Sequence, residues 1–130
     1  MPQTTTRVTQ VGTVIVPVSD QDKAIAFYTE TLGFEKRLDV PMGDAMRWVE
    51  VAPAGAVTSI AIVPPREGEP VGVETRIALN TTDVDADHAD LKARGVDVDD
   101  EVSRYGDPVP PMFWFRDQDA NSLLIVQADS

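Results

Sequence analysis

Two short apolar stretches, AVTSIAIVP at residues 56–64 and DANSLLIVQ at residues 119–127, share one pattern. Each residue from Ser59 to Val63 corresponds to a residue of similar type 63 positions further along the chain. The same offset places VIVPVSDQD at 14–22 over IALNTTDVD at 77–85. A pattern that repeats at a fixed spacing over separate stretches indicates repeated structural units. The sequence therefore predicts two copies of one module.

Each copy predicts a helix directly after its first apolar run. In both, a hydroxyl residue stands three positions before an Asp: Ser19 before Asp22, and Thr82 before Asp85. This is the spacing of a capping box, with Asp in place of the usual Glu or Gln. Apolar residues then recur at helical spacing, and a glycine ends each pattern. We expect helices that begin near residues 20 and 83.

Three strand candidates follow each predicted helix. Trp48 and Trp114 lie in the middle candidates and are 66 positions apart, so we align them and attribute the extra three positions to loop length. The Pro- and Gly-rich PPREGEPVG at 64–72 is typical of a link between modules. The strand candidates are 34–39, 45–52 and 57–63 in the first copy, and 96–102, 111–116 and 122–127 in the second.

These elements predict an α+β fold of two βαβββ modules that form a curved mixed sheet around a cleft. We expect one structural domain with an N-terminal tail at 1–10, a first module at 11–63, a linker at 64–73 and a second module at 74–127. A cleft between sheets is the usual place for a small ligand.

Composition narrows the function. The 130-residue chain has no cysteine, which excludes disulfides, thiolate catalysis and zinc–thiolate sites. Its net charge of −11 repels nucleic acid and anionic membranes. That charge serves either to attract cationic ligands or simply to keep the protein in solution. Without a signal-peptide pattern or a long apolar run, we expect a cytoplasmic protein with no nucleic-acid or membrane partner.

The duplicated module, with PVSDQDKAIAFYTETLGF at 17–34 and FWFRDQDANSLLIVQ at 113–127, resembles the vicinal-oxygen-chelate superfamily. That superfamily includes glyoxalase I, extradiol dioxygenases, methylmalonyl-CoA epimerase and the bleomycin-resistance proteins. The resemblance covers about residues 11–127. It implies the paired-module fold, but not one activity, because members differ in chemistry.

The resemblance also implies where metal ligands would stand, in the first and last strands of each module. These positions fall on Thr13, Ala61, Arg76 and Leu124, and none is a usual metal ligand. A guanidinium at one of them would repel a divalent cation. We therefore expect no metal and no other cofactor. DQDAN at 117–121 superficially resembles a calcium loop, but it lacks the required Gly and closing Glu, so we expect a tight turn.

Strand alternation assigns the side chains that would line the cleft. It puts the apolar positions on the helix side and turns the polar and tryptophan positions away from it. Tyr105, in the loop 103–112, is either a lid or part of a passive loop. The tryptophans either line a pocket or complete the core or a dimer contact, and Arg76 either meets an anionic ligand group or pairs with Glu50 or Glu74. The predicted ligand-binding residues are Thr13, Trp48, Glu50, Ala61, Arg76, Tyr105, Trp114, Arg116 and Leu124.

The favoured function is a metal-independent small-molecule-binding protein of the glyoxalase/bleomycin-resistance type that sequesters a drug-like or metabolic compound. The alternative is a glyoxalase-like lyase, isomerase or dioxygenase in the same cleft, with or without a divalent metal; Arg76 and Glu50 are then the candidate catalytic residues.

We expect a homodimer, because small sheets leave edges and apolar surface to cover and the resembled family commonly dimerises. Whether the modules pair within one chain or between chains stays open.

Overall fold

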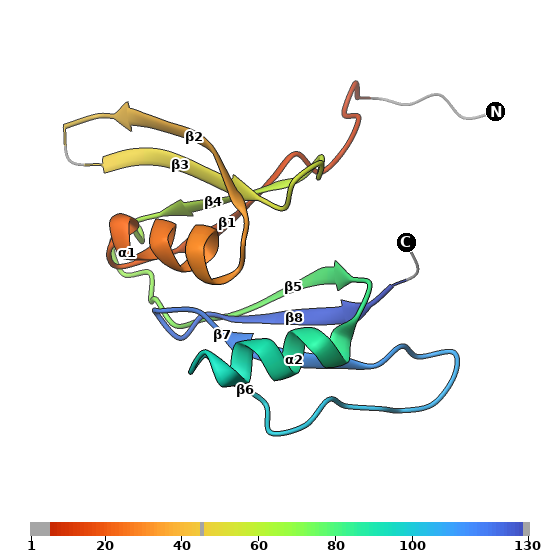
Figure 1. Cartoon of the computed structure of the whole chain (residues 1–130). Helices are drawn as coiled ribbons and strands as arrows, with labels where there is room; N and C mark the ends of the chain where they lie inside the picture. The colour runs from red at the N-terminus through yellow and green to blue at the C-terminus, as the bar shows by residue number, and fades with distance from the viewer. Residues whose placement is uncertain (1–5, 45, 129–130) are drawn as a thin grey trace.

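The computed structural model describes residues 6–44 and 46–128, and they form two modules with the same order of elements (Figure 1). The first module contains β1 (Thr13–Pro17), α1 (Gln21–Ala26), the π-helical turn η1 (Phe27–Thr31), β2 (Glu35–Met42), β3 (Met46–Ala52) and β4 (Ser59–Val63). The second contains β5 (Glu74–Thr81), α2 (Val84–Ala93), β6 (Asp97–Val98), β7 (Met112–Arg116) and β8 (Ser122–Gln127). The predicted pair of βαβββ modules is confirmed. No helix in the described ranges is long and apolar enough to cross a membrane.

Each module has its own four-stranded mixed sheet. The strand order is β1-β4-β3-β2 in the first sheet and β5-β8-β7-β6 in the second. In both, the first and last strands of the module pair in parallel, and the other neighbours are antiparallel. The expected curved sheet is therefore present as two separate sheets of the same topology.

The helix starts differ from the predicted capping boxes. Asp20 and Asp83 are the N-caps, and each carboxylate accepts a hydrogen bond from the backbone amide three residues later, at 3.1 and 3.0 Å. A carboxylate satisfies a free helical amide as well as a hydroxyl does. The Ser19 hydroxyl, predicted to cap α1, instead donates to Asp119 of the second module. The prediction was wrong by one residue in each module.

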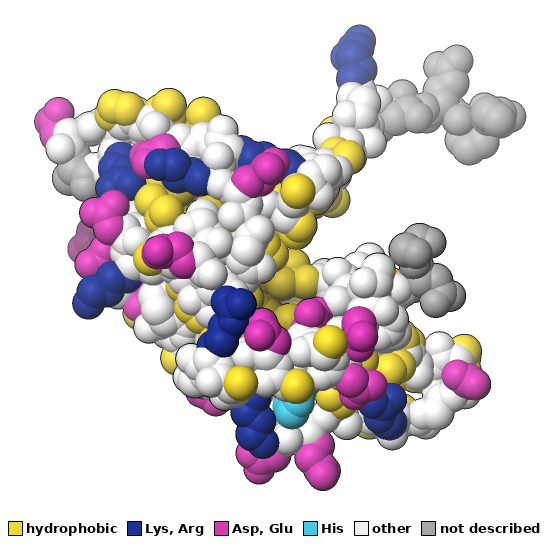
Figure 2. Space-filling model, viewed as in Figure 1, with side chains coloured by type: hydrophobic (Ala, Val, Ile, Leu, Met, Phe, Trp, Pro, Cys, Tyr) yellow, Lys and Arg dark blue, Asp and Glu magenta, His cyan; other side chains and the backbone are white. Residues whose placement is uncertain are grey.

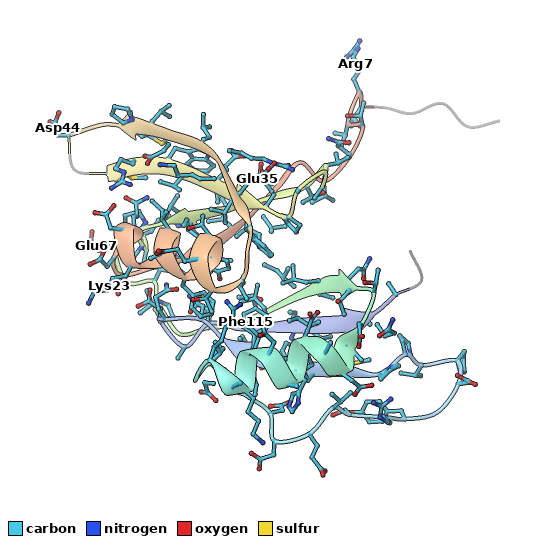
Figure 3. All side chains as sticks on the ribbon, viewed as in Figure 1. Arg7, Lys23, Glu35, Asp44, Glu67 and Phe115 are labelled. Atoms are coloured by element: carbon cyan, nitrogen blue, oxygen red, sulfur yellow. The ribbon has the colours of Figure 1, made fainter. Side chains whose placement is uncertain are left out.

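One hydrophobic core joins the two modules. The helix-side residues of both sheets belong to it, as predicted from strand alternation. The Phe27 ring of η1 stacks on Phe115 of β7 with 6.3 Å between ring centroids, and Figure 3 labels Phe115 between the two modules. The buried sheet residues of this core are Val16, Val49, Val51, Ile60 and Ile62 in the first sheet, and Phe113, Phe115, Leu123 and Ile125 in the second.

A polar contact fixes the same junction. The buried Asp117 carboxylate accepts hydrogen bonds from the Tyr28 hydroxyl at 2.8 Å and from the Asn121 side-chain amide at 3.0 Å. The Asn121 amide also donates to the Pro17 carbonyl at 2.9 Å. Burial and the neighbouring Asp117 charge raise the pKa of Tyr28 far above its ordinary value. The 117–121 stretch is thus the predicted tight turn, and it ties the modules together.

The second module therefore lies on the helix side of the first sheet. Figure 1 shows this arrangement, with α1 between the first sheet and the second module. The opposite face of the first sheet points away from the second module, because successive side chains of a strand alternate between the two faces. We call the two sheet faces that lie opposite the helices the first and second open faces.

Candidate functional site

Strand pairing defines the centre of the first open face. Ile15 lies opposite Ala61, Ala61 opposite Glu50, and Glu50 opposite Leu38, so these four residues form one row across the sheet. Ile15 and Leu38 are 60% and 40% exposed, although both are large and apolar. The row thus places one carboxylate in the middle of an apolar surface.

Two side chains on the same face orient Glu50. Its carboxylate accepts hydrogen bonds from the Ser59 hydroxyl at 2.6 Å and from the Trp48 indole nitrogen at 2.7 Å. These two bonds hold the pKa of Glu50 below its ordinary value, the Ser59 bond having the larger effect. Glu50 is therefore ionised at neutral pH. A carboxylate held in this state is a poor proton donor and a weak base.

The apolar surface continues along β2. Val40 and Met42 follow Leu38 at alternate positions of this strand, and both are exposed. Figure 2 shows hydrophobic side chains along the outer edge of the first module, where β2 lies. An exposed apolar face of this extent on a small protein is typical of an interface or a ligand site.

The second open face has a different chemical character. Trp114 lies opposite Leu124, and Leu124 opposite Ala78, which gives an aromatic and aliphatic row. Arg116 lies two residues after Trp114 and points to the same face. Its guanidinium pairs with Asp99 at 3.0 Å and with Asp97 at 3.7 Å. The positive charge on this face is already balanced by neighbouring carboxylates.

The strand pairing corrects the alignment of the two tryptophans. Ala61 and Leu124 are 63 positions apart, and their partners on the middle strands are Glu50 and Trp114. Trp114 therefore corresponds to Glu50, and the offset between the middle strands is 64 rather than 66. Both tryptophans still belong to open faces, because Trp48 is two residues from Glu50.

Arg76 does not take the place expected from the repeat. Thr13 lies opposite Ser59 in the first sheet, but in the second sheet Ser122 lies opposite Glu74, because β5 is irregular between Glu74 and Ala78. Arg76 falls in this irregularity with a left-handed φ of 60°. Its side chain is 82% exposed, and its guanidinium lies 3.9 Å from the Glu74 carboxylate. That pairing is one of the two alternatives left open by the sequence.

The structure thus divides the predicted ligand-binding residues between separate surfaces. Tyr105 is 71% exposed in the loop between β6 and β7. Arg76 borders a cavity on the helix side of the sheets. The remaining residues lie on the first open face (Thr13, Trp48, Glu50 and Ala61) or on the second open face (Trp114, Arg116 and Leu124).

The cavity beside Arg76 was not predicted. It has a volume of about 830 Å³ and lies between the modules, beyond the end of η1. Figure 2 shows a hydrophobic hollow between the two halves of the molecule. The sequence could not reveal this cavity, because it depends on how the modules pack against each other. Its apolar lining includes Val14, Leu32, Phe34, Ile60, Ile77, Leu79, Leu91 and Ile125, with Asp87 and Asp90 of α2 beside them.

The residues at the four inherited ligand positions do not fit a metal. Ala61 and Leu124 have no side-chain donor atom, and Arg76, which lies in the irregularity of β5, offers only a positively charged guanidinium. Elsewhere in residues 6–44 and 46–128, no group of three His, Asp or Glu side chains is arranged to hold a metal ion. His88, the one histidine, packs against Phe113 with 5.0 Å between ring centroids.

Comparisons with known proteins agree with this architecture. The model of the glyoxalase/bleomycin resistance protein/dioxygenase superfamily matches residues 10–124. The chain is 35% identical to the uncharacterized protein YetH of Bacillus subtilis (strain 168), over 89% of this chain and 96% of that protein.

Two solved structures from Streptomyces sp. CB03234 are similar as well. TnmS3, an antibiotic binding protein, is 39% identical with a TM-score of 0.83, over 95% of this chain and 99% of TnmS3. A glyoxalase/bleomycin resistance protein is 43% identical with a TM-score of 0.75, over 88% of this chain and 97% of that one.

Proposed function

Because the chain belongs to the glyoxalase/bleomycin resistance protein/dioxygenase superfamily, we propose that it binds and sequesters a small molecule without a metal. The likeness to an antibiotic binding protein over nearly the whole chain supports binding rather than turnover. The donor-poor residues Ala61 and Leu124 at the inherited ligand positions support metal independence. The low pKa of Glu50 weighs against its use as a general acid.

The observation that carries this proposal is the pair of open faces, each with one tryptophan among apolar neighbours. Trp48 lies opposite Val40 on the first face, and Trp114 lies opposite Leu124 on the second. Aromatic and aliphatic walls with a few fixed polar groups are typical of ligand pockets. Each face by itself is a single wall, so a pocket needs both.

The two walls cannot meet within one chain, because the second module lies on the other side of the first sheet. We infer that the protein is a homodimer in which the first open face of one copy meets the second open face of the other. A twofold dimer of this kind forms two equivalent clefts. It also covers the exposed apolar side chains of Ile15, Leu38 and Met42.

Two measurements test the proposal. Light scattering after size-exclusion chromatography should give the mass of two chains at micromolar concentration. Aromatic compounds should bind saturably and quench the tryptophan fluorescence, which arises only from Trp48 and Trp114 because the chain has no other tryptophan. A monomer, or a fluorescence that no ligand perturbs, contradicts the proposal.

The variants Trp48→Phe and Trp114→Phe separate the two walls. Each leaves a single tryptophan as the reporter of one open face. If one ligand lies between both walls, the two variants report dissociation constants for it that agree within about threefold. Quenching of one tryptophan only would assign the ligand to a single face and reject the shared cleft.

A further inference from the structure

We propose that the ligand carries a cationic group with N–H donors on an aromatic or otherwise apolar body, and that Glu50 binds this group. The inference rests on the proposed function, since it concerns the ligand of the same cleft. It follows from Glu50, which has no cationic partner on the first open face, and from Arg116, whose charge on the second open face is already paired.

Within residues 6–44 and 46–128, no Lys or Arg forms an ion pair with Glu50, whose hydrogen-bond partners are Ser59 and Trp48. The nearby Asp39 and Arg47 of β2 and β3 pair with each other at 2.9 Å, and Arg47 also contacts Asp22 of α1, which places this pair on the helix side. Arg37 contributes least among the causes that shift the pKa of Glu50. Its guanidinium donates to the carbonyls of Ala56 and Pro53 and to Glu35.

In the described part of the chain, the second open face has no unpaired cation beside Trp114 either. Arg116 is the charged residue beside Trp114, and it already has two carboxylate neighbours, Asp97 and Asp99. A cleft formed from one first face and one second face therefore keeps a net negative charge near Glu50. An anionic ligand would be repelled there, whereas a cationic group would be attracted.

The carboxylate of Glu50 can accept further hydrogen bonds. Ser59 donates to one oxygen and Trp48 to the other, so each oxygen keeps a second lone pair. The two donors also fix the orientation of the group before any ligand arrives. A charged hydrogen bond from an ammonium or amidinium to such a carboxylate is stronger than a neutral one, and an adjacent indole ring attracts cations as well.

The net charge of −11 acts in the same direction. It raises the local concentration of cations around the protein and speeds their association at low salt. This general effect cannot by itself select a site, but Glu50 can. The experiment must therefore separate a specific contact with Glu50 from the overall charge.

Three probes that share one ring system but differ in charge separate a contact with Glu50 from the effect of the overall charge. The probes are 9-aminoacridine, which is cationic at neutral pH, acridine, which is neutral, and acridine-9-carboxylate, which is anionic. Binding is measured by tryptophan quenching and calorimetry at low and high salt. The test variant is Glu50→Gln, which keeps the shape of the side chain. The control is Glu67→Gln, an exposed linker residue near α1 in Figure 3, which changes the net charge equally.

The parent should bind the cation about tenfold more tightly than the neutral ring, with the anion weakest. Glu50→Gln should reduce the preference for the cation to less than about threefold and leave acridine binding nearly unchanged, while Glu67→Gln keeps the parent's preference. Equal binding of cation and neutral ring by the parent overturns the inference without any variant. A preference that survives in Glu50→Gln overturns it too. If none of the three rings binds saturably, the proposed function fails along with the inference.

Discussion

Glu50 and Trp114 occupy equivalent positions in the two modules. Each is the middle-strand partner of a last-strand residue, Ala61 for Glu50 and Leu124 for Trp114. The same backbone position thus carries an ionised carboxylate in the first module and an aromatic ring in the second. A cleft that combines the two faces has an ionic wall and an aromatic wall, and so can orient a ligand by charge at one side and stacking at the other.

The low pKa of Glu50 predicts a definite pH dependence. A carboxyl group whose pKa is lowered by folding stabilises the protein above its unfolded pKa, here about 4.5, and loses this contribution as the pH falls through the folded pKa. The difference in unfolding free energy between the parent and Glu50→Gln should therefore shrink as the pH is lowered from 6 to 3. Urea titrations over that range measure it, and a difference that is constant with pH would contradict the assignment of the carboxylate.

The contact between Tyr28 and Asp117 should be costly to remove. Tyr28→Phe deletes one donor to a buried carboxylate, and we expect a loss of about 1–3 kcal/mol in unfolding free energy. Tyr105→Phe is the matched control, because its hydroxyl belongs to an exposed side chain and its loss should change stability by less than about 0.5 kcal/mol. If urea unfolding shows the same loss of unfolding free energy for both variants, the contact between Tyr28 and Asp117 does not stabilise the module junction.

The N-cap of α2 can be tested directly, because the sequence pattern predicts Thr82 at this position and the structure places Asp83 there. Asp83→Ala should destabilise the protein by about 1 kcal/mol, because the carboxylate that accepts the Ala86 amide is lost. Thr82→Ala, at the cap expected from the capping-box pattern, should cost far less. Chemical unfolding measures the free-energy loss in both variants. A larger loss for Thr82→Ala than for Asp83→Ala would support Thr82 as the cap and contradict the structure.

Metal independence predicts the elemental content of the purified protein. Nickel, zinc, iron and manganese should all be far below one atom per chain after purification without chelators, because Ala61 and Leu124 offer no donor atom and residues 6–44 and 46–128 contain no group of three His, Asp or Glu side chains arranged to hold a metal. Aromatic ligands should bind equally well before and after treatment with EDTA. About one metal atom per chain, lost together with ligand binding, would show that a metal site exists elsewhere in the cleft.

The sequence predicted the repeated module well because the signal is periodic. Apolar residues at alternate positions decide which face of a strand is buried, and Val49, Ile62 and Phe113 all lie in the core as that rule requires. The offset of 63 also placed Ala61 and Leu124 in equivalent positions on the last strands. These features depend on neighbours along the strand and require no knowledge of how the modules pack.

Two further features, the irregularity of β5 and the relation between the modules, could not be predicted from the sequence. The irregularity at Arg76 changes the pairing of β5 by two residues, and a left-handed arginine has no signature in a sequence. The relation between the modules depends on contacts between distant residues, such as the hydrogen bond from Asn121 to Pro17. The sequence could therefore indicate which residues belong to open faces, but not that these faces turn away from each other within the chain.

The central claim, a cleft shared between two chains, is tested most directly by mixing two defective variants. Trp48→Ala impairs the first open face and Trp114→Ala the second, so each homodimer has only impaired clefts. A mixed dimer, however, contains one cleft with two intact faces, one from each chain. Calorimetry of an unfolded and refolded equal mixture should recover parent-like affinity for 9-aminoacridine in about a quarter of the clefts, as random pairing requires. If the mixture binds no better than the separate variants, the cleft lies within one chain and the account is wrong.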